Sequence, residues 1–274
     1  MSGGNREPGR TVTSKVLAIL DSFTGQDQEL TLSAISGATG LPLATAHRLV
    51  AELVSWGGLE RRPGGAYGIG IRLWEIGSLA PQRTGLREIA IPFMEDLYEA
   101  THENVQLAIL DGHDALFVEK ISGRDSVPIV TRVGGRLPLH ATGVGKVLLA
   151  FAPPAFIEEI IERGLPRLTK HTIVEPDELR GCLEDVRRTG FAQTRDEMTI
   201  GSVSVAAPVY GPAYTVVAAM SIVVRSRPAD FGRLALAVRT AALGLSRRVV
   251  ESWDGSMLLA PASPTPAEAE QIAD

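Results

Sequence analysis

The chain has 274 residues, 45% of them hydrophobic and 22% charged, and a formal net charge of −5 at pH 7. This composition is that of a globular protein, and the length suffices for two domains with separate cores. The single cysteine, Cys182, excludes an intrachain disulfide and a cysteine-cluster zinc site, and it fits a reducing compartment. Residues 1–10 are polar and do not resemble a signal peptide, and no run reaches the roughly 20 apolar residues of a membrane span. We therefore expect a cytoplasmic protein without a membrane partner.

The first helical pattern follows a polar segment, residues 1–10, which we expect to be a disordered tail. Apolar residues recur at helical spacing from Val12 to Phe23 and predict a first helix. The stretch from Thr31 to Trp56 predicts two further helices with a tight turn between them. Thr31 or Ser33 can cap the first of these two by accepting a hydrogen bond from a backbone N–H.

The turn and the second of these helices are typical of a DNA-binding helix-turn-helix. Gly40 ends the first helix, because only glycine adopts a left-handed conformation without a Cβ penalty, and Pro42 suits the first turn of the next. The predicted apolar face of the second helix consists of Leu43, Ala46, Leu49, Val50, Leu53 and Val54. The predicted DNA-contacting side chains on the two helices are Ser33, Thr45, His47 and Arg48. An ordinary pair of helices in a helical core is the alternative interpretation.

A basic hairpin follows directly. Leu59–Arg62 and Ala66–Ile69 predict two short strands around the turn Pro63–Gly65. A helix-turn-helix followed by such a hairpin is a winged helix, and the hairpin is its wing. Arg61 and Arg62 lie beside the tip, where we expect them to reach backbone phosphates.

The charge distribution gives weak support to DNA binding. Residues 1–75 carry no net charge, whereas residues 40–74 carry +2, so the positive charge is local. We expect the winged helix-turn-helix domain to span residues 11–80.

A helical run from Leu86 to Ala100 predicts a linker helix within residues 81–100, with a kink at Pro92. The residues on its apolar face are Ile89, Phe93, Leu97 and Ala100. Large exposed apolar surfaces usually mark interfaces, so we expect this face to contribute to self-association.

From Asn104 onward the pattern changes to short strand-forming runs separated by turn residues. The predicted strands are Val105–Leu110, Leu116–Ile121, Pro128–Val133, Phe191–Thr194, Ser202–Tyr210 and Ala213–Val224. The predicted helices are Val147–Phe151, Pro154–Gly164, Pro176–Gly190 and Phe231–Trp253. Strands early and late with helices between them favour an α+β domain over residues 101–253, and residues 254–274 are expected to be a disordered tail.

The segment Gly143–Lys146 does not fit a nucleotide-binding loop. The first glycine of GxxxxGK[ST] would fall at His140, and Val147 lacks the hydroxyl that binds magnesium. A better account is an anion site at the backbone N–H groups that begin the helix over residues 144–151, with Lys146 in a structural role.

No pattern indicates catalysis. The five histidines lack metal-ligand spacing, and no serine lies in a GxSxG turn. We therefore expect no metal, no cofactor and no catalytic residue. Asp196 and Glu197 are adjacent and would point to opposite faces of an extended strand, so they make a poor acid–base pair. One of them could bind a ligand group, and a solvated turn is the alternative.

From about Val12 to Val250, the chain resembles the IclR family of bacterial transcriptional regulators. The N-terminal part carries LPLATAHRLVAEL and LERRPGGAYGIG, and the second part carries RVGGRLPLHATGVGKVLLA, LTKHTI and GFAQTRDEMTIGSVSVAAPV in the family's order and spacing. The resemblance implies a winged helix followed by a GAF-like domain that binds a small organic effector and helps oligomerisation. Family recognition helices often begin with a Lys-Ser-Thr type of sequence, which is replaced here by Leu43–Thr45, so two polar contacts are missing.

The resemblance also implies which residues contact the effector. These are Leu137, Gly143, Val144, Thr194, Asp196, Glu197, Ser204, Ser221 and Val223. Ser204 keeps the polarity common at its position, whereas Val223 replaces a frequent serine and makes the pocket less polar. We expect a small organic acid or a comparable metabolite with an apolar body. Tight core packing of the glycines and serines is the alternative.

The predicted function is effector-responsive control of transcription, as a repressor in the first place and an activator as the alternative. The predicted partners are a double-stranded DNA operator, a small effector, and further copies of the chain in a homodimer or a dimer of dimers. The effector would change the relative placement of two winged helices, and half-site spacing would decide which placement binds DNA. An enzyme or carrier that uses the same pocket, and a plain dimerisation module, are the other classes considered.

Overall fold

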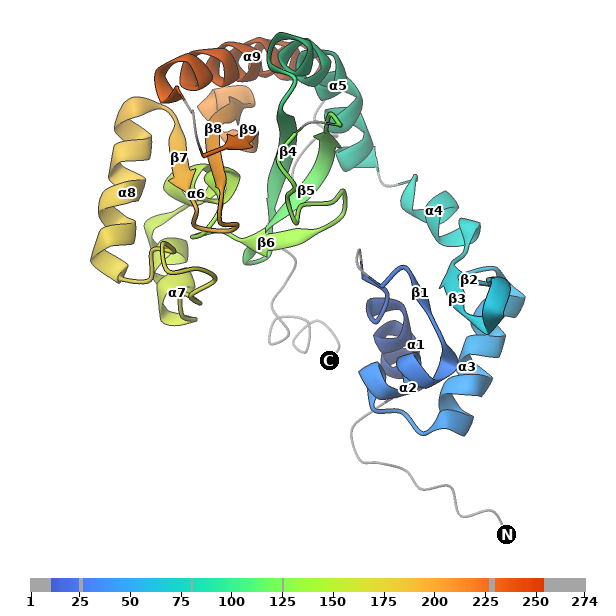
Figure 1. The fold of residues 1–274 in the computed structure, drawn as a ribbon. Helices are drawn as coiled ribbons and strands as arrows, with labels where there is room; N and C mark the ends of the chain where they lie inside the picture. Colours follow the sequence, from blue (N-terminus) through green and yellow to red (C-terminus); the bar gives the residue numbers. More distant parts are fainter. Residues whose placement is uncertain (1–10, 25–26, 80, 125, 227–229, 254–274) are drawn as a thin grey trace. The chain divides into compact units, whose positions relative to one another are not determined.

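The computed structural model forms two compact units, residues 1–80 and 81–274 (Figure 1). The predicted tails at residues 1–10 and 254–274 lie outside the described part of the chain. The described residues are 11–24, 27–79, 81–124, 126–226 and 230–253.

The first unit combines helices with a small antiparallel sheet in the order β1-β3-β2 (Figure 1). Its elements are α1 (Val12–Asp21), β1 (Glu29–Leu30), α2 (Leu32–Thr39), α3 (Leu43–Trp56), β2 (Leu59–Arg61), β3 (Tyr67–Ile69) and α4 (Ile71–Gly77). This is the predicted winged helix-turn-helix, and β1 is a strand that the sequence pattern did not predict.

Local chemistry accounts for the turn between α2 and α3. The Thr31 hydroxyl accepts a hydrogen bond from the Ala34 N–H at 3.2 Å, so Thr31 rather than Ser33 caps α2. Gly40 ends α2 with a φ of 68°, the left-handed conformation that favours glycine. Pro42 lies directly before the first residue of α3.

The core of the first unit confirms most of the predicted apolar face of α3. The buried members of that face are Ala46, Leu49, Val50 and Leu53, and they pack in one cluster with residues of α1, α2 and the sheet. The prediction was wrong for Leu43, whose exposed fraction is 53%. The core cluster reaches α3 only from Ala46 onward, so the first turn of the helix extends beyond it.

The second unit is built on an antiparallel sheet in the order β6-β5-β4-β9-β8-β7 (Figure 1). Its strands are β4 (Asn104–Asp111), β5 (Asp114–Ile121), β6 (Arg136–Pro138), β7 (Ala192–Arg195), β8 (Ser202–Tyr210) and β9 (Val216–Arg225). Its helices are α5 (Pro81–Thr101), α6 (Gly143–Ala150), α7 (Pro154–Glu162), α8 (Pro176–Thr189) and α9 (Phe231–Glu251). The predicted α+β class is confirmed.

The two faces of this sheet differ in character. Alternate strand residues such as Val105 and Met220 point toward α5 and α9 and form one apolar core. The opposite face has an apolar half under α6, α7 and α8, which includes Ala108 and Ala219. The remaining part of that face carries polar side chains, and these are Asn104, Gln106, Glu119, Thr194, Ser202, Ser204 and Ser221. The sheet therefore has a polar area enclosed within a folded domain.

The apolar face of the linker helix, which we expect to contribute to self-association, packs within its own domain instead. In the structure, Leu97 is buried, and Ile89 and Phe93 are partly buried against the core shared by α5 and α9. The ring of Phe93 lies so close to α9 that a Cβ at Gly244 would be 3.0 Å from it. The apolar face of α5 is thus used within its own domain, and the helix continues through Pro92.

The predicted strand at Pro128–Val133 is also wrong. This segment is irregular and lies over the polar part of the sheet, and the paired strand is β6 instead. Lys120 donates to the Thr131 carbonyl within this segment at 2.9 Å, and Asn104 donates to the carbonyl of Val127, the residue just before it, at 2.8 Å. Its β-branched composition matches a strand, but its backbone is held by side chains rather than by a neighbouring strand.

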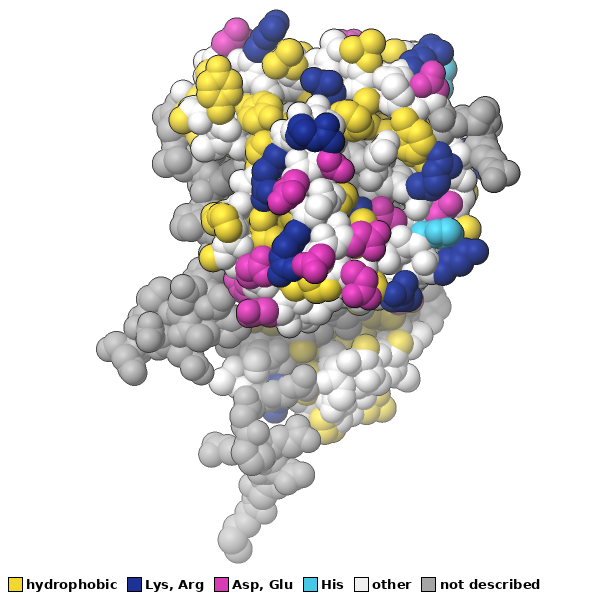
Figure 2. All heavy atoms as spheres, turned by 90° about the vertical axis from the view of Figure 1, so that its left-hand side faces the viewer, with side chains coloured by type: hydrophobic (Ala, Val, Ile, Leu, Met, Phe, Trp, Pro, Cys, Tyr) yellow, Lys and Arg dark blue, Asp and Glu magenta, His cyan; other side chains and the backbone are white. Residues whose placement is uncertain are grey.

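The outer face of the second unit around α7 and α8 carries acidic and basic side chains side by side (Figure 2). Arg180 pairs with Glu158 and Asp177, and Arg188 pairs with Asp185. Charges of opposite sign therefore pair with one another on this face. Over the described residues, no helix is long and apolar enough to cross a membrane.

Candidate functional site

The leading end of α3 presents polar side chains, as predicted. His47 and Arg48 are exposed and Thr45 is half-buried. Arg48 donates to Glu52, one turn later, at 2.7 Å, and both side chains remain largely exposed. Ser33 is exposed in the first turn of α2.

The two wing arginines have different surroundings. The Arg62 guanidinium lies 2.6 Å from a Glu60 carboxylate oxygen and 3.8 Å from one of Glu29. The Arg61 guanidinium lies over the Tyr67 ring, 5.7 Å from its centre. Within the described chain no ion pair involves Arg61, so its positive charge is the less compensated of the two.

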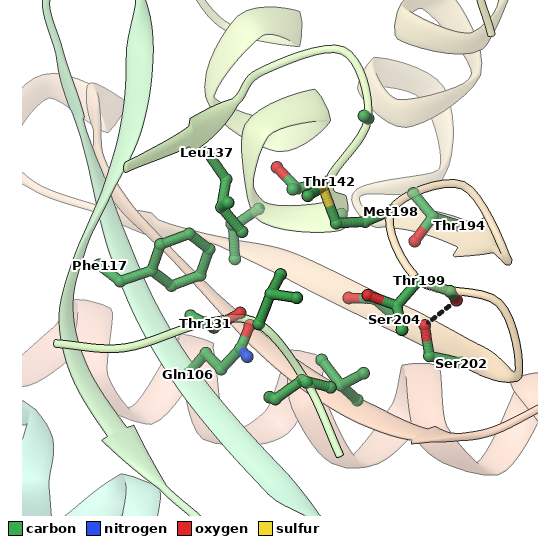
Figure 3. A pocket seen from close by; sticks show the side chains of 16 residues that line it. Gln106, Phe117, Thr131, Leu137, Thr142, Thr194, Met198, Thr199, Ser202 and Ser204 are labelled. Carbon is green, nitrogen blue, oxygen red and sulfur yellow. Dashed lines mark hydrogen bonds between the residues drawn. The ribbon is translucent and has the colours of Figure 1, made fainter. Parts of the chain in front are cut away.

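The second unit contains a pocket over the polar part of the sheet, with about 420 Å³ of empty space that includes its opening to solvent (Figure 3). Its polar lining residues are Gln106, Thr131, Thr142, Thr194, Thr199, Ser202 and Ser204. Its other lining residues are Phe117, Ile129, Val130, Leu137, Ala141, Gly143, Val144, Met198 and Val223. In Figure 3, Gln106 and Thr131 lie across the pocket from Thr194 and Met198.

The start of α6 forms one wall of this pocket. Thr142 caps the helix, since its hydroxyl accepts from the Gly145 N–H at 3.1 Å and donates to the Pro138 carbonyl at 3.1 Å. The Gly143 and Val144 N–H groups have no acceptor among the described residues. The Gly145 N–H is thus already used by the helix cap. The other two remain available to a ligand oxygen.

Gly143 allows α6 to approach β8 closely. A Cβ at this position would lie 2.6 Å from the Ser204 hydroxyl oxygen and 3.3 Å from the Ala206 Cβ. The family resemblance implies that Gly143 contacts the effector, and its missing side chain would let a ligand approach the backbone. The structure shows that Ser204 already occupies part of this space, so Gly143 also serves helix–sheet packing.

Six of the nine positions implied by the family resemblance line the pocket: Leu137, Gly143, Val144, Thr194, Ser204 and Val223. The other three do not. Ser221 has no exposed surface and lies behind Gln106, to whose Oε1 its hydroxyl donates at 3.3 Å. Asp196 accepts from the Gly201 N–H at 2.6 Å, within a turn that its φ of 60° helps to form.

Glu197 forms a buried ion pair. The Lys146 ammonium lies 2.6 Å from one carboxylate oxygen and 2.8 Å from the other. Burial raises the pKa of Glu197 above its usual value, and attraction by Lys146 opposes this shift. The hydroxyls of Thr169 and Thr172 donate to the carbonyls of Asp196 and Glu197, respectively. Residues 196–201 are therefore held in place rather than forming a solvated turn, and the structural role predicted for Lys146 agrees with this geometry.

Sequence patterns missed the most unusual polar group of the pocket. Gln106 is 3% exposed, and its Nε2 has no hydrogen-bond partner. A usable signal existed, because a glutamine alternates with apolar residues in the predicted strand Val105–Leu110 and so shares a face with Ala108. The described residues contain no group of three or more metal-ligating side chains.

A winged helix-turn-helix, followed by a second domain with a pocket over its sheet, is the architecture of regulators in which one chain both binds DNA and senses a ligand. Residues 12–63 match the IclR helix-turn-helix domain, and residues 79–247 match the family described as bacterial transcriptional regulator IclR C-terminal. The chain belongs to the IclR family of bacterial transcriptional regulators, with a DNA-binding N-terminal domain and a C-terminal effector domain.

Individual relatives are similar to this chain over most of its length. It is 33% identical to the HTH-type transcriptional regulator KipR of Bacillus subtilis over 239 residues, which are 86% of this chain and 95% of KipR. It is 31% identical to the HTH-type transcriptional repressor AllR of Salmonella typhimurium over 225 residues, 80% of this chain and 83% of AllR. A crystal structure of an IclR homologue from Microbacterium hydrocarbonoxydans complexed with 4-hydroxybenzoate has a TM-score of 0.82 at 33% identity, covering 87% of this chain and 99% of that chain.

Proposed function

We propose that this regulator is a repressor whose operator binding is controlled by a small aromatic acid bound in the pocket of the second unit. The pocket itself carries the proposal, because it combines apolar walls, buried hydroxyls and two available N–H groups at the start of α6. The repressor AllR and the 4-hydroxybenzoate complex of another relative support the direction of control and the ligand class.

The chemistry of the lining favours one negative charge on the ligand. A carboxylate oxygen can accept from the Gly143 and Val144 N–H groups, where the helix dipole also favours an anion. No lysine, arginine or histidine lines the pocket in the described part of the chain. Phe117, Leu137 and Met198 offer apolar surface to the body of the ligand, as an aromatic ring requires.

On the DNA side, we propose that Thr45, His47 and Arg48 face the major groove and that the wing contacts backbone phosphates. Ser33, in the exposed first turn of α2, is proposed to contact the DNA backbone. The chain is proposed to act in the cytoplasm, by binding alone and without catalysis or a cofactor, so a bound acid should be recovered unchanged.

We propose further that the protein acts as a homodimer or a dimer of dimers on a roughly palindromic operator. The apolar face of α5 is used internally, but other apolar side chains are exposed within the first unit. Trp74 and Leu79 have exposed fractions of 67% and 77%, and Ile71 has one of 64%. Exposed apolar groups of this size, close together in sequence, suit a contact between two copies of the chain.

An electrophoretic shift experiment tests the proposed function. The purified protein should retard the DNA upstream of its own gene, and 4-hydroxybenzoate should release it. Light scattering on the same sample should give a mass of at least two chains. Absence of binding to this DNA would reject the operator, and binding that no aromatic acid changes would reject the ligand class.

A further inference from the structure

Gln106 occupies the centre of the enclosed sheet, on β4, and its side chain lines the pocket (Figure 3). Among the described residues, its Nε2 is the buried side-chain nitrogen or oxygen without a hydrogen-bond partner. A buried donor without an acceptor destabilises a folded protein, because it has lost its bonds to water and gained none.

The amide oxygen of Gln106 faces Ser221. Ser221 lies directly opposite Gln106 in the ladder between β4 and β9, and its hydroxyl donates to Oε1 at 3.3 Å. With Oε1 toward Ser221, the amide oxygen has a hydrogen-bond partner and Nε2 has none. The Nε2 end, with its two N–H bonds, is then left on the side of the pocket.

We infer that Gln106 is a specificity-determining residue that donates a hydrogen bond to an uncharged acceptor oxygen on the ligand, at the end opposite its carboxylate. This inference rests on the proposed function of the pocket. It narrows the ligand to one class, the aromatic monoacids with a hydroxyl or carbonyl group at the far end. The two ends of the ligand meet two different donor groups, the N–H groups at the start of α6 and the amide on β4.

The same lining argues against a second carboxylate on the ligand. A buried anion needs a cation or several donors, and the groups near Gln106 are an amide, hydroxyls and apolar side chains. A methyl group at the far end would fill the space but would leave Nε2 unpaired. A site with a buried donor discriminates strongly against such an analogue.

Three probes of similar shape test the inference by calorimetric titration: 4-hydroxybenzoate, 4-methylbenzoate and benzene-1,4-dicarboxylate. The wild-type chain should bind the hydroxy acid at least about tenfold more tightly than the methyl acid, as expected for one lost hydrogen bond at a buried donor. The dicarboxylate should bind more weakly than either. In Gln106→Met, which keeps the length of the side chain, the preference for the hydroxy acid should fall to about one.

Gln193→Met is the matched control, since Gln193 is exposed on β7 and does not line this pocket. It should keep the wild-type preference. An unchanged preference in Gln106→Met, or a wild-type chain that binds hydroxy and methyl acids equally, would overturn the role of Gln106 and leave the ligand class intact. A wild-type chain that binds none of the three acids would reject the ligand class and the role of Gln106 together.

Thermal unfolding without ligand separates a ligand-binding amide from a structural one. The double change Gln106→Met with Ser221→Ala removes both hydrogen-bonding partners and the unpaired donor. We expect its melting temperature to be the same as that of the wild type or up to about 2–4 °C higher. A melting temperature several degrees lower would show that the amide stabilises the fold, and that result would count against the inference.

Discussion

The Nζ atom of Lys146 lies 2.6 Å and 2.8 Å from the two carboxylate oxygens of Glu197, and both side chains are buried. Lys146 belongs to the first turns of α6, and Glu197 belongs to the loop that leads from β7 to β8. The two residues after Glu197, Met198 and Thr199, line the pocket. The ion pair therefore joins two walls of the pocket, which makes the cavity a preformed feature of the domain.

A double-mutant cycle should measure this link. Lys146→Met and Glu197→Leu should each lower the free energy of unfolding by about 3–5 kcal/mol, because each leaves a buried charge without its partner. The double variant should be destabilised by much less than the sum, since neither charge remains. Urea unfolding followed by circular dichroism gives the three values. Additive effects would mean that the two charges do not depend on each other.

The buried imidazole of His140 should give the domain an acid-sensitive stability. Burial lowers the pKa of His140 below its usual 6.5, while its hydrogen bond to the Pro166 carbonyl opposes the shift and Lys146 adds to it. Between the lowered pKa of the folded state and the usual value of 6.5, the unfolded chain binds more protons than the folded one. The free energy of unfolding is therefore highest above pH 6.5 and is lost as the pH falls through the lowered pKa.

His140→Gln, which retains a donor for the Pro166 carbonyl, should remove this part of the pH dependence. The measured quantity is the unfolding free energy from pH 8 to pH 5 in both proteins. The wild type should lose at most about 1.4 kcal/mol per pH unit more than the variant in the acidic range. Parallel curves would show that His140 does not control the acid sensitivity.

Arg48 should contribute to operator recognition rather than to stability. Its ion pair with Glu52 is exposed and can be exchanged for a DNA contact at little cost. Arg48→Ala should weaken operator binding by about 1–3 kcal/mol if the side chain reads a guanine, and it should weaken binding to unrelated DNA much less. Glu52→Ala frees the guanidinium and serves as the control, which should not weaken binding. Equal losses on both DNA sequences after Arg48→Ala would reassign Arg48 to a phosphate.

The wing arginines should differ, although the sequence pattern treats them alike. Arg61→Ala should weaken binding to all DNA sequences and reduce the dependence of log K on log salt by about one unit. Arg62→Ala should have a smaller effect on that slope, because Glu60 and Glu29 already compensate its charge. Fluorescence anisotropy over a salt series measures both slopes. A larger slope change for Arg62 would show that its ion pairs open on DNA.

The elements that local chemistry determines were predictable from the sequence. Gly40 and Thr31 define the turn between α2 and α3 through a left-handed φ and a side-chain cap, and both effects act within a few residues. The sequence could not predict what covers the face of Ile89 and Phe93. An apolar helical stripe looks the same whether α9 or a second chain covers it.

The pocket likewise combines features that the sequence predicts with features that depend on long-range contacts. Ser204 and Thr194, two of the residues that the family resemblance implies, line the pocket. Glu197 is paired with Lys146 instead, and a sequence does not show that a lysine 51 residues earlier lies beside it. Gln106 was missed for a related reason. Whether a buried glutamine is paired depends on strands that are far apart in the sequence, such as β4 and β9.

Substitutions at Gly143 should distinguish a role in helix–sheet packing from a role in ligand access. A Cβ there would meet the Ser204 hydroxyl oxygen at 2.6 Å, so Gly143→Ala should lower the free energy of unfolding by about 1–3 kcal/mol through overpacking. Adding Ser204→Ala removes that oxygen and leaves the nearest contacts of the new Cβ at 3.3 Å, so the double variant should regain most of the loss. Thermal unfolding with and without 4-hydroxybenzoate measures stability and ligand response together. If Gly143 instead serves only ligand access, Gly143→Ala should keep its melting temperature and lose the ligand response, and Ser204→Ala should not restore it.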